Sequence, residues 1–250
     1  MARTSIDLSA DVGELPGHEG RQLDASIIAI VTTAHIAAGG HAGDSSTMDA
    51  SVAACLEHGT RIGCHPSYVD REGFGRRHVD LAPRVVAEQV ATQVATLDEM
   101  ARRAGGRVES VKPHGQLYHD LSVDRELLAE VCAFLDAEMF LVLPAASPAL
   151  DHARSRLLRG VAEGFCDRRY DVDGTLLPRS RPDALIDDPA RAANQALDLA
   201  TRGLAAQGTV AQVDSLCVHS DSPSAVVMVT TVRATLEGAG IEVAPVAAPR

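Results

Sequence analysis

The sequence predicts an α/β fold: a seven-stranded parallel β/α barrel of the TIM-like type, formed as a single domain over residues 1–250. Short β-rich runs alternate with longer helical patterns, which is typical of βα units joined into a parallel sheet. Charged and imidazole side chains gather in short glycine-punctuated runs, each directly behind an apolar, strand-like run. Because a parallel α/β protein assembles one active site from the ends of successive strands, this pattern indicates an enzyme.

The expected strands are short apolar runs bounded by turn residues. They lie near Ser5–Ser9, Thr32–Ala37, Arg61–Cys64, Val108–Val111, Met139–Leu143, Leu158–Gly164 and Ser215–Val218, with a possible eighth at Ile241–Val246. Seven strands separated by helices favour a closed or nearly closed barrel over a small open sheet.

Helical patterns fill most of the intervals between these strands. In the clearest, Pro83–Arg103, apolar residues repeat at three- and four-residue spacing and so form one stripe against the sheet. Helices are also expected to start at Ser147-Pro148, Asp188-Pro189 and Ser222-Pro223, because a capping side chain followed by proline suits the first helical turn. The irregular segment Asp171–Asp187 is interpreted either as a flap over the site or as a plain surface excursion.

Composition limits the partners and the compartment. A net charge of -11 at pH 7 argues against the basic face that nucleic acids and anionic membranes require. The five cysteines include no C-x-x-C pair, which favours reduced thiols over disulfides or a structural zinc site. Since the N-terminus has no apolar export segment and no run reaches ~20 apolar residues, we expect a soluble cytoplasmic protein without membrane association.

Acidic residues surround the end of the first expected strand. Asp7 and Asp11 are candidate catalytic residues, and Glu14 is a candidate substrate-binding residue. Carboxylates at this position can act as general bases or hold a divalent metal, and they can also simply shape a turn or cap the next helix.

Histidines follow three later strand ends. His41 lies among glycines and small residues, which let a ligand approach the backbone, and it is a candidate catalytic residue. His65 and His114 each adjoin a proline behind an apolar run, and His114 is also a catalytic candidate because imidazole transfers protons near neutral pH. Together with Asp7 they form a candidate one-metal site, which needs about three protein ligands and an open position for water. The remaining histidines outside strand ends, namely His18, His58, His78, His119 and His152, are expected on the surface.

Cationic and mixed-charge segments complete the candidate site. Lys112 ends a strand, where an ammonium is costly without a partner, so it either pairs with a carboxylate or, as a catalytic residue, stabilises developing negative charge. Adjacent guanidiniums suit carboxylate or phosphate, and backbone N–H groups at a helix start favour anions. On these grounds the further substrate-binding candidates are Arg76, Arg77, Asp167, Arg168, His219 and Asp221.

Five segments, taken together and in this order, resemble the LamB/YcsF family. They are His41-Ala-Gly-Asp44, Asp70-Arg-Glu-Gly-Phe-Gly-Arg-Arg77, Val111-Lys-Pro-His-Gly115, Asp167-Arg-Arg-Tyr-Asp-Val-Asp-Gly-Thr-Leu-Leu-Pro-Arg179 and Cys217-Val-His219. The resemblance runs from Asp7 to about Ile241. It implies a seven-stranded barrel similar to the glycoside hydrolase/deacetylase group.

The resemblance also implies an activity, since the family includes the A subunit of bacterial 5-oxoprolinase. That activity is the ATP-dependent opening of the 5-oxoproline lactam to glutamate, carried out in a complex with the partner B and C subunits. ATP is the implied co-substrate, bound either by this chain or by its partners, and a divalent metal remains an open alternative.

The chain departs from the family pattern around the presumed site, at Ser9, Ala10, His35, Ala38 and Gly40. These departures indicate a divergent paralogue whose substrate can differ from 5-oxoproline. Two other interpretations therefore stay open: a stand-alone metal-dependent hydrolase similar to deacetylases, and a non-catalytic regulatory subunit.

Overall fold

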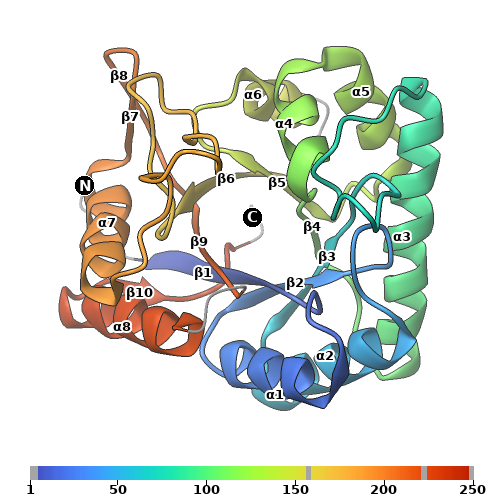
Figure 1. Ribbon diagram of the computed structural model, residues 1–250, viewed down its shortest axis with the longest axis horizontal. Helices are drawn as coiled ribbons and strands as arrows, with labels where there is room; N and C mark the ends of the chain where they lie inside the picture. The colour runs from blue at the N-terminus through green and yellow to red at the C-terminus, as the bar shows by residue number, and fades with distance from the viewer. Residues whose placement is uncertain (1–4, 156–158, 221–223, 248–250) are drawn as a thin grey trace.

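Seven parallel strands form a closed ring in the computed structural model, which describes residues 5–155, 159–220 and 224–247 (Figure 1). The ring runs in the order β1-β2-β3-β4-β5-β6-β9, and β9 pairs with β1 to close it. The strands are β1 (Ser5–Val12), β2 (Thr33–Ala37), β3 (Arg61–His65), β4 (Ser110–Val111), β5 (Phe140–Pro144), β6 (Arg159–Phe165) and β9 (Ser215–His219). The predicted seven-stranded parallel barrel is confirmed.

Strand β1 shows why barrel strands read as nearly continuous apolar runs. Every residue of β1 after Ser5 is buried, because one face of the strand lines the barrel interior and the other packs against helices. Its register places Asp7 beside Ser215 and Asp11 beside His219. Residues 7, 9 and 11 share one face by the two-residue periodicity, so both acidic residues point into the barrel at different heights.

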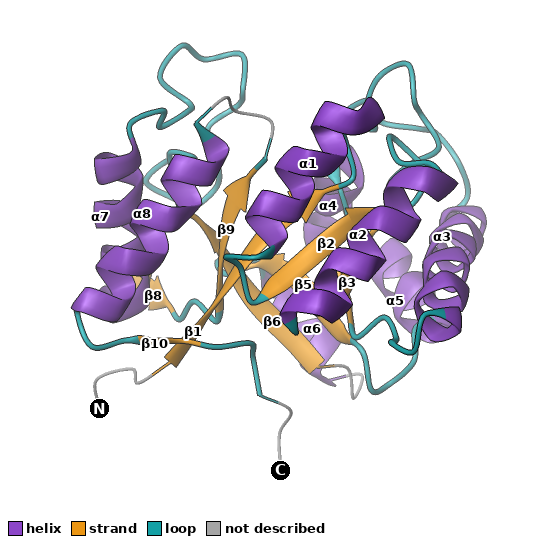
Figure 2. Cartoon of the chain, turned by 90° about the horizontal axis from the view of Figure 1, so that it is seen from below, coloured by secondary structure: helices purple, strands orange, loops and turns teal. Residues whose placement is uncertain are grey.

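Eight helices of the described residues surround the ring, as Figure 2 shows from the side. The helix predicted at Pro83–Arg103 begins and ends at those residues, and the predicted starts at Pro148 and Pro189 are also confirmed. The start predicted at Ser222-Pro223 lies outside the described residues. The helices are α1 (Gly17–Ile28), α2 (Ser45–His58), α3 (Pro83–Arg103), α4 (Gly115–Val123), α5 (Arg125–Phe134), α6 (Pro148–Ser155), α7 (Pro189–Arg202) and α8 (Ala225–Gly238).

Two features differ from the sequence prediction. The possible eighth strand is the short β10 (Glu242–Val243), which pairs only with the first two residues of β1 and does not enter the ring. The antiparallel pair β7 (Leu204–Ala206) and β8 (Thr209–Ala211) was not predicted. Its strands have three residues each, too few to show a period-two pattern in the sequence.

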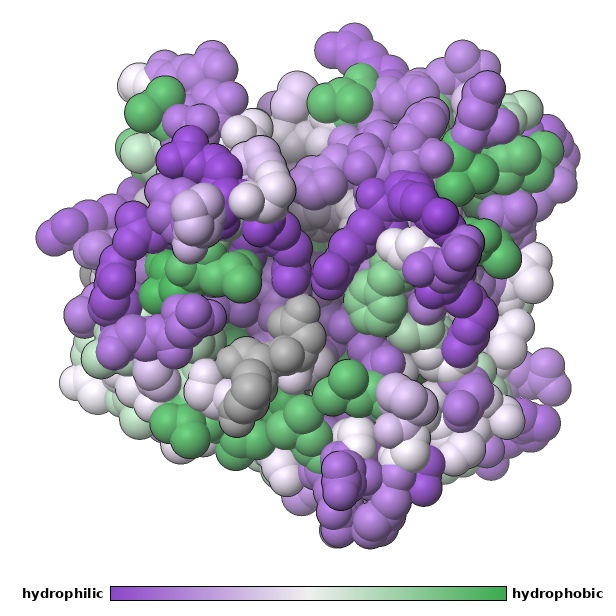
Figure 3. All heavy atoms as spheres, viewed as in Figure 1, coloured by the Kyte–Doolittle hydropathy of each residue, from purple (hydrophilic) through white to green (hydrophobic). Residues whose placement is uncertain are grey.

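The core is built of Ala, Val, Leu and Ile from the strands and the inward faces of the helices. The face shown in Figure 3 is mostly hydrophilic, with apolar side chains in small groups. None of the helices in the described part of the chain is long and apolar enough to cross a membrane.

A buried carboxylate of α1 weakens the fold at neutral pH. Asp24 is 2% exposed and accepts one hydrogen bond, from the Gly13 amide at 3.0 Å. Burial raises its pKa from 3.8 to about 6. Because this pKa is raised in the folded state, ionisation costs stability as pH rises through 4 to 6, and the full cost of about 3 kcal/mol is present above pH 6.

We expect Asp24→Asn to raise the free energy of unfolding at pH 8 by up to about 3 kcal/mol, since the amide keeps an acceptor for Gly13 and carries no charge. The gain should fall to about half at pH 5. Urea denaturation of both proteins at the two pH values checks this. An equal gain at both values would contradict the assigned cause.

Candidate active site at the carboxyl ends of the barrel strands

A cavity of about 420 Å³ opens at the carboxyl ends of the strands. Two long loops arch over the ring on opposite sides of it, one following β3 and one following β6 (Figure 1). The cavity is lined by residues from both loops and from five strand ends: Asp11, Glu14, His65, Arg76, Lys112, Pro113, His114, Gly115, Gln116, Tyr118, His119, Phe165, Arg168, Leu176, Leu177, Pro178, Arg179 and His219.

Lys112 lies at the cavity wall between two carboxylates. Its Nζ is 2.9 Å from Asp11 Oδ1 and 2.9 Å from Glu163 Oε1, and all three side chains are almost fully buried. The same Nζ lies 3.0 Å from Cys217 Sγ, and Tyr118 Oη donates a 2.7 Å hydrogen bond to Glu163 Oε2. The partner that the sequence required for a buried ammonium is therefore a pair of carboxylates.

Charge attraction determines the pKa shifts of Asp11 and Lys112, whereas burial determines that of Glu163. Burial alone would raise the pKa of Asp11 and lower that of Lys112, but their mutual attraction holds the Asp11 pKa well below its usual value and the Lys112 pKa well above. Burial dominates at Glu163 and raises its pKa. Lys112 and Asp11 are thus a fixed ion pair, whereas Glu163 takes up a proton more readily than an ordinary glutamate.

Three imidazoles and Glu14 cluster beside this ion pair. His41 Nε2 lies 3.0 Å from Glu14 Oε1, and His65 Nε2 lies 3.0 Å from His114 Nδ1. The rings of His41 and His114 stack with their centroids 3.6 Å apart. Burial lowers the pKa of His65 to about 4 and lowers that of His114 further. The cluster therefore contains neutral imidazoles, which are the form that abstracts protons or binds metals.

The loop after β3 places Gly75 close to His41 and His114. Gly75 has φ +63°, and a Cβ built there would lie 3.0 Å from His41 Cβ and 3.1 Å from His114 Cδ2. A side chain at this position is strained by its backbone and also displaces both rings. Gly59, at φ +68° with no atom within 4 Å of such a Cβ, shows the backbone strain alone.

We expect Gly75→Ala to cost 1–3 kcal/mol of stability and to reduce activity, because it shifts the two rings. The matched control Gly59→Ala should cost about 1 kcal/mol through the same backbone strain and leave activity unchanged. Thermal unfolding and turnover of both variants check this. Equal activity in the two variants would contradict a role for the ring positions.

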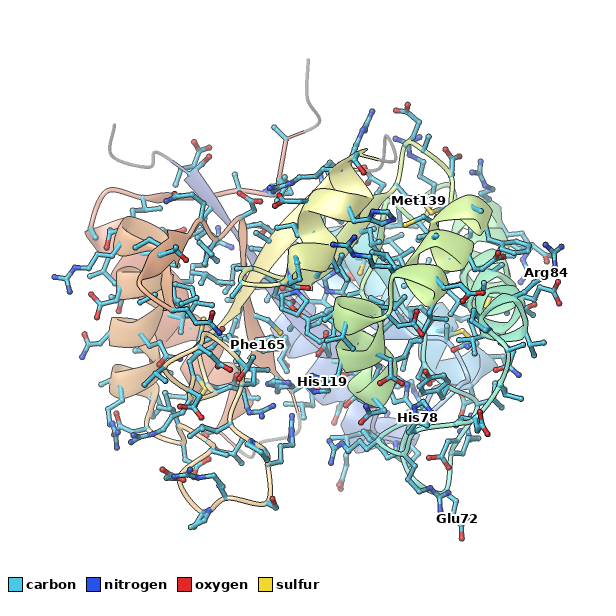
Figure 4. The ribbon with its side chains drawn as sticks, turned by 90° about the horizontal axis from the view of Figure 1, so that it is seen from above. Glu72, His78, Arg84, His119, Met139 and Phe165 are labelled. Atoms are coloured by element: carbon cyan, nitrogen blue, oxygen red, sulfur yellow. The ribbon has the colours of Figure 1, made fainter. Side chains whose placement is uncertain are left out.

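A second pair closes the opposite side of the cavity. The Asp167 carboxylate accepts hydrogen bonds from His219 N and Nδ1 at 3.0 and 2.9 Å, and the His219 ring stacks on Phe165. Asp167 thus orients His219 and does not itself line the cavity. Figure 4 shows Phe165 and His119 in the middle of the molecule, between the two halves of the barrel.

Part of the irregular segment after β6 covers the cavity, as one of its two interpretations predicted. Residues 176–179 line the cavity, and Arg168 Nη2 holds the segment in place by donating to the Leu177 carbonyl at 2.7 Å. Arg168 and Arg179 on this side, together with Arg76 from the loop after β3, give the rim of the cavity a positive charge. Such a rim is suited to anionic groups.

Two candidate residues of the described part of the chain, Asp7 and Arg77, lie away from the cavity. Asp7 lies deeper in the barrel, about 13 Å below Asp11 at the rise of a strand, where its carboxylate accepts hydrogen bonds from Thr32, Thr33 and Ser215. Because Asp7 lies four positions before Asp11 in β1, it is not near His65 and His114. Arg77 turns outward and pairs with Asp70 and Glu72, and Figure 4 shows Glu72 at the outer edge of the molecule. Asp221 lies outside the described residues.

The structure also adds residues that the candidate set lacked. Glu163, Tyr118 and Cys217 contact Lys112 or its carboxylate partner. Glu163 lies near the end of β6, in a glycine-punctuated run like those of the other candidates, and this run was the signal that could have found it. His119, expected on the surface, lines the cavity, since its helix begins at the cavity wall.

The departures from the family pattern lie below or behind the cavity. Ser9 and His35 are fully buried in the barrel, where His35 Nε2 lies 3.3 Å from Ser110 Oγ. A Cβ at Gly40 would approach Ser67 Oγ and Gln93 Oε1 to 2.4 Å, so a larger residue there requires these two side chains to move. None of the five departing residues is among the described residues that line the cavity.

Comparison with known proteins agrees with this geometry. The 5-oxoprolinase A subunit of Methylococcus capsulatus is 44% identical over 251 residues, covering 98% of this chain and 96% of that protein. The crystal structure of a lactam utilization protein from Thermus thermophilus superposes with a TM-score of 0.85 at 34% identity, covering 96% of this chain and 99% of that one. A family 4 carbohydrate esterase from Streptomyces lividans shares the fold alone, with a TM-score of 0.51 at 12% identity over 97% and 93% of the two chains. The LamB/YcsF family model matches residues 6–250, and the chain belongs to this family.

Proposed function

We propose that this chain is a hydrolase of cyclic amides and acts as the A subunit of an ATP-dependent 5-oxoprolinase, in complex with the partner B and C subunits. The names of its relatives support the substrate and the assembly, and they match it over almost their whole length. The substrate-facing residues support it as well, because Ser9, Ala10, His35, Ala38 and Gly40 are not among the described residues that line the cavity.

The reaction needs activation of an amide. The lactam carbonyl is a poor electrophile and the amine is a poor leaving group, so water alone opens the ring slowly. Transfer of the γ-phosphoryl group of ATP to the amide oxygen turns this oxygen into a leaving group. Water then adds to the carbon and the C–N bond breaks, which frees the amine and leaves an acyl phosphate. A second water molecule hydrolyses the acyl phosphate, and the products are glutamate, ADP and phosphate. We propose that the nucleotide is bound by the partner subunits.

The observation that carries the proposal is the Lys112 ammonium in the cavity wall, beside Glu14 and the imidazoles. Because Asp11 keeps Lys112 charged, Lys112 provides a fixed positive charge where negative charge develops on the substrate oxygen. Glu14 lies on the same wall and is placed to take a proton from water. Arg76, Arg168 and Arg179 at the rim of the cavity are suited to the substrate carboxylate or the transferred phosphate.

Glutamate release tests this proposal. The purified chain, the B and C subunits, 5-oxoproline and ATP are combined, and each component is then omitted in turn. We expect glutamate only from the complete mixture. Absence of glutamate there, with the B and C subunits shown to be active beside a related family member, rejects the proposal. Release without ATP would favour the stand-alone hydrolase instead.

A further inference from the structure

We propose that Glu14, His41, His65 and His114 bind one divalent transition-metal ion of the zinc class. The four side chains each offer a ligand atom, and these atoms all lie within 4.8 Å of one another. The role of the metal in the reaction rests on the proposed function. The positions of the four side chains support metal binding independently of that function.

The hydrogen bonds of two histidines fix which nitrogens bear protons. His65 Nδ1 lies 2.6 Å from the Lys112 carbonyl oxygen, and His114 Nε2 lies 3.0 Å from the Phe74 carbonyl oxygen. A carbonyl oxygen only accepts, so both of these nitrogens donate. In the neutral rings, His65 Nε2 and His114 Nδ1 are then both lone-pair acceptors.

These two acceptors face each other at 3.0 Å, although both side chains are buried. Two lone pairs at that distance repel unless a positive species lies between or beside them. A metal ion satisfies both at once. The outward N–H···O=C bonds are also the arrangement that orients histidine ligands in metal sites.

The distances agree with a common ion. Four ligands at about 2.1 Å from a tetrahedral metal lie about 3.4 Å apart. Glu14 Oε1 lies 3.0 Å from His41 Nε2, 3.4 Å from His114 Nδ1 and 3.8 Å from His65 Nε2. His65 Nε2 and His114 Nδ1 lie 3.0 Å apart. These distances between ligand atoms lie on both sides of the value of about 3.4 Å expected for a tetrahedral ion.

His41 turns its Nε2 toward the cluster, 3.0 Å from Glu14 Oε1. Its Nδ1 is buried and has no hydrogen-bond partner among the described residues. An ion at Nε2 requires the proton on Nδ1, so this unpartnered atom bears on the tautomer of His41 and not on the ion itself. Its partner in the cluster, Glu14, supplies a negative charge that offsets part of the charge of a dication.

The donor set selects the class of metal. Three imidazoles and one carboxylate suit Zn²⁺, Co²⁺ or Fe²⁺ better than Mg²⁺ or Ca²⁺, which prefer oxygen ligands. Glu14, His65 and His114 line the cavity, so the ion faces the substrate. When bound, such a metal polarises a carbonyl oxygen or lowers the pKa of a water molecule. The set replaces the one predicted from sequence, because Glu14 and His41 take the place of Asp7.

Cobalt titration of the purified, tag-free and chelator-treated chain tests the inference. We expect one equivalent of Co²⁺ to bind and to give the visible absorption bands of a four- or five-coordinate ion. His65→Ala and His114→Ala should each weaken Co²⁺ binding at least about 100-fold. Glu14→Gln, which preserves size, should weaken it by about 10- to 100-fold, and circular dichroism confirms that each variant is folded.

Two matched histidine variants serve as controls. His78→Ala removes a 65% exposed imidazole, and His119→Ala removes one that lines the cavity outside the cluster. Both should bind Co²⁺ like the unchanged chain. Absence of a stoichiometric Co²⁺ band, unchanged binding in folded His65→Ala, or a proton shared by His65 and His114 in ¹⁵N spectra with Co²⁺ present overturns the inference. Because the titration uses neither ATP nor partner subunits, its result is separate from the glutamate assay.

Discussion

Replacing Lys112 by methionine is expected to abolish most of the activity and to cost about 3–5 kcal/mol of stability. The ammonium lies 2.9 Å from both Asp11 Oδ1 and Glu163 Oε1. Without it, two buried carboxylates face each other with no compensating charge, and breaking a buried pair in this way is strongly destabilising. The loss of the charge that stabilises the substrate oxygen should lower turnover by about 10²–10³ or more.

The double variant Lys112→Met/Glu163→Gln separates these two effects. Removing the second charge should restore a large part of the stability but none of the activity. Urea denaturation measures the first quantity, and glutamate release in the complete assembly measures the second. A Lys112→Met protein with turnover within about tenfold of the unchanged chain would remove Lys112 from the mechanism.

Replacing Asp11 by asparagine is expected to reduce kcat/KM by about 10² or more, although the shape of the side chain is kept. Asp11 is a positioning residue: it holds Lys112 charged and lies 3.4 Å from His65 Nε2. Attraction to Asp11 is the main influence that raises the Lys112 pKa, so its loss lowers that pKa. If the ammonium is the active form, the alkaline limb of the pH profile moves to lower pH.

A pH profile of kcat/KM checks the Asp11 prediction. The matched control is Asp24→Asn, another buried aspartate that lies outside the cavity lining and should leave the alkaline limb in place. A merely structural role for Asp11 would lower the amount of active protein without moving the alkaline limb. An unmoved limb would therefore contradict the coupling of Asp11 to Lys112.

The sequence predicted some of the residues that meet at the cavity and misplaced two others. Asp11, His65, Lys112 and His114 were predicted to meet because each ends a strand, and parallel strands end on one side of a barrel. Asp7 satisfied the same pattern but lies two inward-facing positions deeper than Asp11, since the sequence does not show which residue of β1 reaches the cavity. Arg77 failed for a different reason: adjacent side chains of a loop point in different directions, and Asp70 holds it outward.

The sequence by itself determined the seven-stranded barrel, the helix from Pro83 to Arg103 and the side of the barrel on which the polar residues gather. These follow from local periodicity, which is a property of neighbouring residues along the chain. Only the tertiary structure decided that Glu163 is a partner of Lys112 and that Glu14 and His41 join His65 and His114. Such pairings depend on strand register and side-chain direction, which are settled when the ring closes through the pairing of β1 with β9.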